Sequence, residues 1–308
     1  YVLAREHAPG LPLHISTQAN TTNWQAARFW KSQGASRAVL ARELSLAEGA
    51  ETGERSGLAT EVFVHGAMCV SYSGRCLLSS YLTGRSANQG DCSHPCRWQY
   101  ALAEQKRPGD YLPIEEDSRG SYIMNSRDLC LISLVPELMT AGFDAWKIEG
   151  RNKSAYYVAN TVRIYRAAID AYCQDPAGYH FRGEWLEELE TLSHRGYTQG
   201  FALKPADNQA YRYEDGGYLR SHDFAAILWA ADGCRALLEQ RNHFALGDEL
   251  EILLPAGGAN LRLPVTGIFS PEGQALTAAN HPRQQVTVPA ALAERLRGPL
   301  ICRRRSRA

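Results

Sequence analysis

The sequence has 308 residues, a mass of 34.1 kDa and equal numbers of basic and acidic residues, 33 of each. Hydrophobic residues make up 44% and charged residues 21%, which is typical of a globular protein and excludes a disordered, collagen-like or coiled-coil chain. No apolar run reaches the roughly 18 residues of a membrane span. The zero net charge excludes a global field that would attract nucleic acid, although a local basic patch remains compatible with it. We expect about two domains and no membrane partner.

The N-terminal residues 1–20 lack the charged start and apolar stretch of a signal peptide. Eight cysteines in a chain of this length are too dilute for a disulfide-stapled secreted fold. We therefore expect a cytoplasmic protein with reduced thiols. The chain begins with Tyr1 rather than Met, which suggests a fragment, a processed chain or an incomplete gene model.

Four strand-like runs alternate with helix-like runs in residues 1–173. The strand candidates are 11–17, 36–44, 60–69 and 143–151, and the helix candidates are 23–33, 45–57, 128–142 and 154–173. This order predicts four βα units and a parallel sheet, with a Cys-rich insertion at 69–127 in the third unit. A complete eight-stranded barrel needs about 250 residues. The region is therefore either a small open sheet or half of a barrel.

The C-terminal part has a different pattern. A connector at 174–217 contains Pro and Gly, and after it come short apolar runs separated by Gly, Asn and Pro, at 224–230, 234–240, 248–254, 261–269 and 284–289. This pattern predicts a small all-β, barrel-like domain over 218–308. The basic run at 303–307 is either a solvated tail or an arm that contacts phosphates.

Four cysteines follow the third strand within 28 residues: Cys69, Cys76, Cys92 and Cys96. Thiolates in groups of four bind zinc or an iron–sulfur cluster, because soft sulfur suits these metals. Buried reduced thiols and redox or nucleophilic thiols are the alternatives. The position directly after a strand is where a parallel barrel places its chemistry.

Several long motifs resemble peptidase family U32. The resemblance rests on EVFVHGAMCVSYSGRCLLSSYLTGRSANQGDCSHPCRW (61–98), KIEGRNKSAYYVA (147–159) and HRGYTQGF (194–201). ISTQAN (15–20) and LARELSLAE (40–48) resemble the branch of tRNA 5-hydroxyuridine modification proteins. The similarity covers residues 1–205, and the remainder resembles the family's C-terminal β domain.

The resemblance implies a TIM-barrel-like (β/α)8 domain in which about a hundred residues precede Tyr1, so that 1–173 is its C-terminal half. Some members are named peptidases, and others hydroxylate a wobble uridine in tRNA, an rRNA cytidine or a ubiquinone precursor without oxygen. Several carry a 4Fe-4S cluster, and the RNA-modifying branch draws on prephenate. Cys69, Cys76 and Cys92 match the cluster positions. Cys96 is the expected fourth ligand, and Cys130 competes with it.

Charged and polar residues near the predicted strand ends are candidates for a site. Glu61, Phe63 and His65 share one predicted strand face, and Lys147, Glu149 and Arg151 share another. We expect a pocket for an anionic co-substrate such as prephenate, with Glu43, His65 and Glu149 as catalytic groups. The expected substrate-binding residues are His14, Gln18, Asn20, Arg42, Lys147 and Arg151.

These residues also have structural interpretations. Lys147, Glu149 and Arg151 could form an ion-pair network, because buried charges need partners. His14 could be a core histidine, and Gln18 and Asn20 could cap the following helix.

Basic and aromatic residues interleave around the cysteines, which suits an extruded base and its flanking phosphates, or else an ordinary polar loop. They are Arg75, Arg85, Arg97, Trp98, Tyr100, Lys106, Arg107 and Tyr111.

The function that follows is prephenate-dependent, oxygen-independent hydroxylation of the tRNA wobble uridine, with tRNA, a small anionic co-substrate and a protein that delivers the cluster or forms a complex as partners. A peptidase is the alternative, although the chain contains neither GxSxG nor HExxH. A non-catalytic RNA-binding protein with a structural cluster is a third class.

Overall fold

The structure is a computed structural model that describes residues 1–69, 71–98, 126–203, 218–292 and 296–306, and the backbone of 101–103 and 111–113. It divides into two compact units. The first comprises Tyr1–Glu149 and His194–Tyr218, and the second comprises Gly150–Ser193 and Leu219–Ala308. Residues 150–193 therefore pack with the β domain that follows them.

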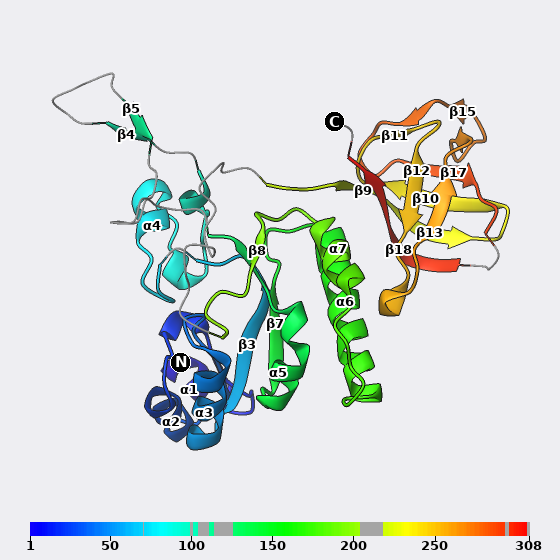
Figure 1. Ribbon diagram of the computed structural model, residues 1–308. Coiled ribbons are helices and arrows are strands. Elements are labelled where there is room, and N and C mark those ends of the chain that lie inside the picture. The colour runs from blue at the N-terminus through cyan, green and yellow to red at the C-terminus, as the bar shows by residue number, and fades with distance from the viewer. Residues whose placement is uncertain are drawn as a thin grey trace. The chain divides into compact units, whose positions relative to one another are not determined.

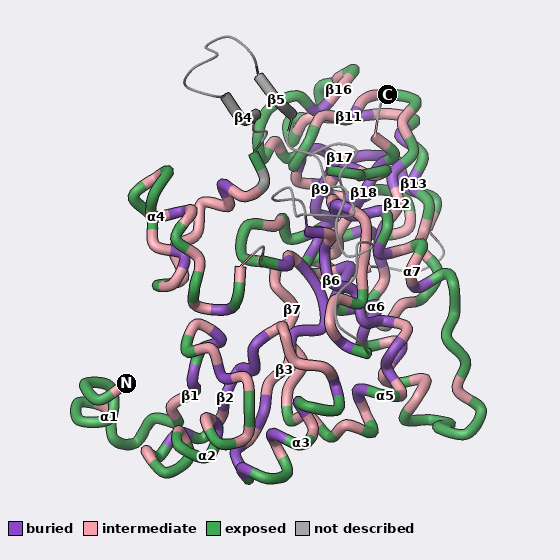
Figure 2. Tube along the Cα trace, turned by 60° about the vertical axis from the view of Figure 1, so that its left-hand side comes forward, coloured by how far each residue is buried: buried purple, intermediate pink, exposed green. Residues whose placement is uncertain are grey.

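Four parallel strands form the centre of the first unit, in the order β1 (His14–Ile15), β2 (Arg37–Val39), β3 (Ala59–Gly66) and β7 (Ala145–Glu149) (Figure 1 labels β3 and β7, and Figure 2 labels all four). This confirms the alternating βα pattern. The described residues do not close a barrel, and the half barrel stays a prediction.

Two well-capped helices connect the first three of these strands. The Asn23 side chain accepts a hydrogen bond at the start of α2 (Trp24–Ser32). Ser45 and Glu48 form a capping box at the start of α3 (Leu46–Ser56), which ends at the left-handed Gly57. These local signals explain why the predicted helices at 23–33 and 45–57 are correct to within about two residues.

The helix predicted over 128–142 is wrong in its first part. Asp128–Cys130 forms strand β6, which is buried at all three positions and pairs antiparallel with the end of β3 (Figure 2). Its other edge pairs with β8 (Tyr197–Thr198). Helix α5 begins only at Val135, where Pro136 occupies the first turn, a position that proline tolerates.

The second unit contains α6 (Ala155–Gln174), α7 (Gly183–Glu190) and an eight-stranded antiparallel sheet. Its strand order is β13-β12-β18-β9-β10-β17-β14-β15, and β11 (Phe244–Ala245) pairs separately with β16 (Ala278–Ala279). The sheet strands are β9 (His222–Ala231), β10 (Arg235–Gln240), β12 (Glu249–Ile252), β13 (Leu261–Pro264), β14 (Ile268–Phe269), β15 (Ala275–Leu276), β17 (Gln285–Pro289) and β18 (Leu296–Arg305). The prediction of an all-β C-terminal domain is confirmed. No helix in the described residues is long and apolar enough to cross a bilayer.

The basic run at the C-terminus is a buried structural element, so both of its predicted roles are wrong for its first two residues. Arg303 and Arg304 lie at the end of β18 with 4% and 7% exposure. Arg303 donates two hydrogen bonds to the Glu188 carboxylate, both of 2.8 Å, and its Nε donates to Glu251 at 2.7 Å. Arg163 of α6 also donates to Glu188, at 2.6 Å. This network joins α6, α7 and the sheet, and paired charges are what a buried site requires.

Replacing Arg303 with alanine is expected to lower the free energy of unfolding by about 3 kcal/mol, because Glu188 and Glu251 would keep their charges without this partner. Urea denaturation of the full chain measures the change. Arg305→Ala is the matched control, because Arg305 lies in the same run but is exposed. Equal losses in the two variants would contradict the buried network.

The same network should weaken in acid. Burial alone would raise the pKa of Glu188, but hydrogen bonds and positive charge from Arg303 and Arg163 outweigh burial and lower it from the ordinary value of 4.5. The stabilisation is therefore present above that value and is lost as the pH falls through the lowered pKa. The difference in unfolding free energy between wild type and Arg303→Ala should shrink over this acidic range, and a constant difference would exclude the titration of Glu188 as its source.

Candidate functional site

The Cys-rich segment is fixed to the carboxyl ends of β1 and β2. Ser73 donates from its backbone N to Glu43 at 2.7 Å and from its hydroxyl to the same carboxylate at 3.1 Å. Gln18 Nε2 donates to the Ala87 carbonyl at 3.1 Å. Gly74 has φ +74°, and a Cβ there would lie 2.1 Å from the Gln18 carbonyl oxygen, so no side chain fits. Gln18 and Glu43, predicted to act on a substrate, hold the segment in place.

A cluster of hydroxyl groups joins the two halves of this segment. Ser93 contacts Ser79 at 3.0 Å and Thr83 at 2.8 Å, and the Ser93 backbone N donates to the Ser79 hydroxyl. Ser79 and Thr83 belong to α4 (Leu78–Thr83), which directly follows Cys76, while Ser93 directly follows Cys92. The turn η3 (Pro95–Arg97), which carries Cys96, packs against the same helix. The hydroxyl cluster therefore holds together the stretches that carry the second, third and fourth cysteines.

Of the four cysteines, Cys69 is exposed and the other three are half-buried. Arg42 Nη1 lies 3.8 Å from the Cys69 sulfur. A neighbouring cation stabilises a thiolate, the form that binds metals. Cys130, the competing fourth ligand, is buried in β6 opposite His65. Cys302 is also buried, which raises the pKa of its thiol to about 12 and keeps it protonated.

The donor chemistry suits a metal or an iron–sulfur cluster, but the side-chain arrangement does not assemble one. Within the ranges that the structure describes, no three His, Cys, Asp or Glu side chains form a group that could hold a metal ion. The predicted cluster therefore stays a prediction that rests on the residue types and on the anchored segment.

Two of the three basic residues predicted to bind the co-substrate, Arg42 and Lys147, meet at the ring of Phe63. The Arg42 guanidinium carbon lies 3.6 Å from the ring centroid, and Lys147 Nζ lies 5.3 Å from it. Lys147 also pairs with Glu61 at 3.1 Å, and Arg37 lies 3.6 Å from the other oxygen of Glu61. Lys147 thus belongs to an ion-pair network, but its partner is Glu61 of the neighbouring strand.

A β-bulge separates Phe63 from His65. The register pairs Phe63 with Lys147 and His65 with Ile148, so the predicted common face of Phe63 and His65 is wrong across the bulge. His65 is fully buried, and its ring lies 5.3 Å from that of Tyr197, which stacks on His194 at 4.4 Å. The predicted catalytic role of His65 stays a prediction.

Residues 194–197 lie near His65, and no role for them was predicted from the sequence. Arg195 is 2% exposed, and its guanidinium lies 5.7 Å from the Tyr218 ring. The only available signal was the HRGYTQGF motif, which indicated a family but no position in space.

The remaining predicted residues lie in different settings. Glu149 ends β7, and its carbonyl approaches Gly66 so closely that a Cβ there would lie 2.3 Å from it. Arg151 is exposed and belongs to the second unit. His14 is exposed on β1, so the core-histidine interpretation is wrong.

Asn20 has a buried side-chain oxygen that forms no hydrogen bond with the described residues. The residue adopts a left-handed conformation after β1. The buried hydroxyl of the adjacent Thr21 likewise has no hydrogen-bond partner in the described ranges. Buried polar atoms of this kind normally bond protein or ordered water, so a ligand or water donor would fit here.

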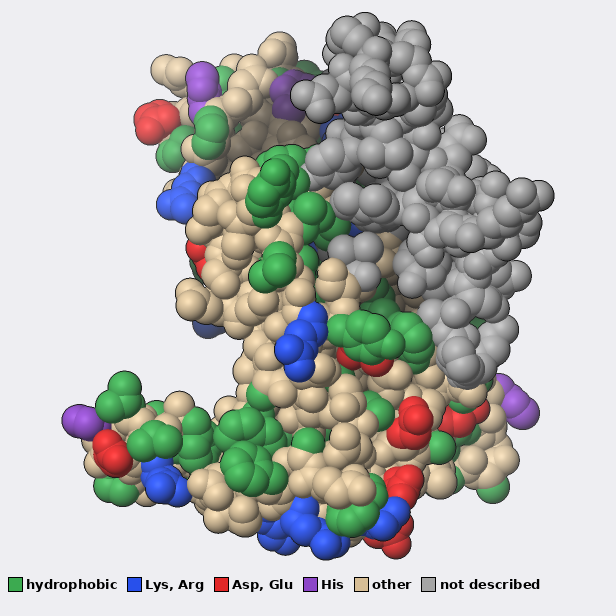
Figure 3. Space-filling model, turned by 90° about the vertical axis from the view of Figure 1, so that its left-hand side faces the viewer, with side chains coloured by type: hydrophobic (Ala, Val, Ile, Leu, Met, Phe, Trp, Pro, Cys, Tyr) green, Lys and Arg blue, Asp and Glu red, His purple; other side chains and the backbone are tan. Residues whose placement is uncertain are grey.

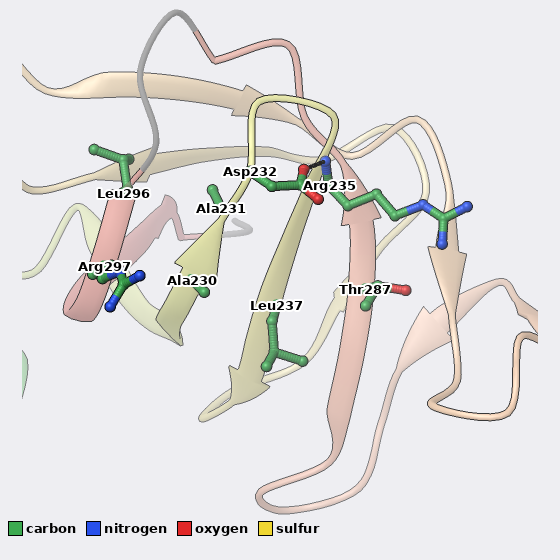
Figure 4. Close-up of a pocket in the computed structure, with 8 residues that line it drawn as sticks. All are labelled: Ala230, Ala231, Asp232, Arg235, Leu237, Thr287, Leu296 and Arg297. Carbon is green, nitrogen blue, oxygen red and sulfur yellow. Dashed lines mark hydrogen bonds between the residues drawn. The ribbon is translucent and has the colours of Figure 1, made fainter.

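Three pockets in the described residues lie apart from this region. One of about 640 Å³ in the first unit lies between the ends of α3 and α5, and one of about 470 Å³ in the second borders Arg163 and Glu188. A third, of about 380 Å³, lies on the β sheet and is lined by Ala230, Ala231, Asp232, Arg235, Leu237, Thr287, Leu296 and Arg297 (Figure 4). None of the three is lined by a predicted site residue.

Comparison with known proteins gives two family matches and several relatives. The model of peptidase family U32 matches residues 1–212, and that of the U32 C-terminal domain matches 220–303. The chain is 38% identical to tRNA hydroxylation protein P of Escherichia coli, over 85% of this chain and 66% of the relative. It is 38% identical to tRNA hydroxylation protein P1 of Bacillus subtilis, over 92% and 67%.

A relative with another activity in its name is a collagenase of Porphyromonas gingivalis, 37% identical over 63% of this chain and 48% of that protein. The chain spans about two thirds of the length of the two tRNA hydroxylation proteins. The two family matches together cover nearly all of its residues, and the chain therefore belongs to peptidase family U32.

Proposed function

We propose that this protein is a tRNA-modifying enzyme that hydroxylates the wobble uridine to 5-hydroxyuridine without oxygen. Prephenate would be the oxygen source, and a 4Fe-4S cluster on Cys69, Cys76, Cys92 and Cys96 would be the cofactor. The observation that carries the proposal is the four-cysteine segment fixed over the strand ends in a chain similar to named tRNA hydroxylation proteins. A tRNA substrate would place the protein in the cytoplasm.

The residues of the first unit suit a small anionic co-substrate. Arg42 and Lys147 supply positive charge beside Phe63, and guanidinium groups bind carboxylates bidentately. Asn20 offers a buried acceptor without a donor in the described residues. His14, Arg151 and Glu149 remain candidates for contacts with RNA or co-substrate. The cluster, when bound, would supply redox or Lewis-acid chemistry; these side chains would bind and orient the reactants.

The direct test is mass spectrometry of tRNA nucleosides from a strain that lacks the gene, with and without the gene restored. Loss of 5-hydroxyuridine and its recovery are expected, and an unchanged level would reject the proposal. Labelled prephenate should transfer its oxygen to the nucleoside. Cleavage of gelatin by the purified protein, with hydroxyuridine unaffected in the deletion strain, would favour the peptidase alternative.

Replacing Cys76 with serine should remove iron and acid-labile sulfide from anaerobically purified protein, because a thiolate ligand is lost. Metal and sulfide analysis measures this directly. Cys173→Ser, a change of an exposed cysteine in the second unit, is the control and should keep both. Stoichiometric zinc without sulfide in the wild type would contradict the cluster.

The fourth ligand is tested in the same way. Cys96→Ser should lose iron and Cys130→Ser should keep it, because Cys96 lies in the anchored segment while Cys130 is buried in a strand. The opposite result would assign the site to Cys130.

Glu43 should act first through Ser73. Hydrogen bonds to charged groups contribute about 1.5–3 kcal/mol, so Glu43→Gln should weaken protection of residues 71–76 by about that amount in amide hydrogen exchange. Ser73→Ala should reproduce only the part that comes from the hydroxyl hydrogen bond, because the backbone N of residue 73 can still donate to Glu43. If Glu43→Gln abolishes hydroxylation while protection stays at the wild-type level, Glu43 is a catalytic group and not an anchor.

A further inference from the structure

Helix α4 buries hydroxyl side chains and exposes an aromatic one, which is the reverse of the usual amphipathic arrangement. Helices in globular proteins normally bury an apolar face and expose a polar one. In α4 the hydroxyl groups of Ser79 and Thr83 turn inward to Ser93, and Ser79 is fully buried. By contrast, Tyr81 of α4 is 86% exposed, and Leu77, which directly precedes the helix, is 72% exposed. Burial within the first unit does not explain this exposure.

Other exposed aromatic side chains lie on the same segment. Leu77 and Tyr81 are four residues apart and lie on one side of the helix. Tyr72 and Trp98 are 66% and 48% exposed, and Trp98 directly follows the turn η3 that packs on α4. Figure 3 shows hydrophobic side chains on the lobe at the height of α4 in Figure 1. We call Tyr72, Leu77, Tyr81 and Trp98 the aromatic face.

The charge of the segment favours a polyanion as the occupant. Residues 69–98 contain three arginines and only one acidic residue, Asp91, in a chain whose net charge is zero. Asp91 is paired with Arg85 at 2.7 Å. Arg75 is exposed and has no ion-pair partner in the part of the chain that the structure describes. An apolar protein partner would not require this excess of positive charge, whereas a nucleic acid would.

We propose that the aromatic face binds single-stranded RNA by stacking bases on Tyr81 and Trp98, with Arg75 contacting a phosphate. Proteins recognise RNA loops by stacking unpaired bases on aromatic rings and by neutralising the flanking phosphates. The face lies on the segment that carries the four cysteines, so a loop bound there would present a neighbouring base to the proposed site. This inference rests on the proposed function, since it identifies the surface that receives the tRNA loop.

The test uses the full chain and a synthetic anticodon stem–loop RNA, with binding measured by fluorescence anisotropy. Tyr81→Leu and Trp98→Leu keep an apolar side chain but remove the ring. Each should weaken binding about tenfold, and the double variant should weaken it further. Tyr81→Phe should bind as the wild type does. Phe29→Leu is the matched control, because Phe29 is a 55% exposed aromatic residue on α2, and it should have no effect.

The salt dependence tests the phosphate contact. Arg75→Ala should reduce the slope of log Kd against log salt by about one, as expected for a single phosphate contact. A slope equal to that of the wild type would overturn the role of Arg75. Unchanged binding by the leucine double variant, with unfolding midpoints equal to the wild type, would overturn the stacking surface and favour a protein partner.

The binding assay requires neither iron nor a co-substrate, so the two proposals fail separately. RNA binding that depends on the aromatic face, together with unchanged hydroxyuridine in the deletion strain, would support the surface and reject hydroxylation. Full hydroxylation and full binding in the leucine double variant would reject the surface alone.

Discussion

The attachment of the Cys-rich segment to the ends of the parallel strands is the constraint on which the candidate site depends. Glu43 holds Ser73 by two hydrogen bonds, and Gly74 lies against the Gln18 carbonyl, between Cys69 and Cys76. Gln18 then holds Ala87, which precedes Cys92. Each contact closes a loop of the chain. A loop that is fixed at several points has less conformational entropy to lose when a ligand binds. The anchors therefore restrict the movement of the segment that carries the thiols.

The distribution of charge explains why a net charge of zero does not argue against RNA. Three buried arginines of the second unit form ion pairs with acidic residues of the same unit. They are Arg163, Arg303 and Arg304, and their partners include Glu188, Glu251 and Asp223. These pairs stabilise the second unit. Because opposite charges in a close pair largely cancel, they add little to the electrostatic potential at the protein surface. In the segment at 69–98, Arg75 and Arg85 are exposed, and Asp91 is its one acidic residue. Local charge, and not the total, determines what such a surface attracts.

Elements that depend on local signals could be predicted from the sequence. Elements that depend on pairing with distant strands could not. The N-caps Asn23 and Ser45 mark the starts of α2 and α3, and both are recognisable in the sequence. By contrast, 128–130 becomes a strand because β3 and β8 offer edges to it, and no local pattern shows that. The bulge beside His65 likewise depends on the register with β7. Residue type selects Gln18, Glu43 and the cysteines as site candidates, and the structure brings Gln18 and Glu43 into contact with the Cys-rich segment. The partners of Gln18 and Glu43 lie 69 and 30 positions away, and alternation and spacing do not encode contacts at that separation.

The reversed polarity of α4 follows from the same requirement for a fixed site. Holding two cysteine-bearing stretches together calls for directional bonds, and the hydroxyls of Ser79, Thr83 and Ser93 supply them where apolar packing would allow sliding. The hydroxyl side of this short helix faces Ser93, and Tyr81 and the preceding Leu77 are left exposed. Exposed apolar surface costs solvation free energy and invites aggregation unless a partner covers it. The proposed RNA loop would cover the aromatic face, because its bases would stack on the aromatic rings and a phosphate would contact Arg75. The hydrogen bonds that order the cysteine-bearing stretches would thus also shape the surface that we propose for RNA.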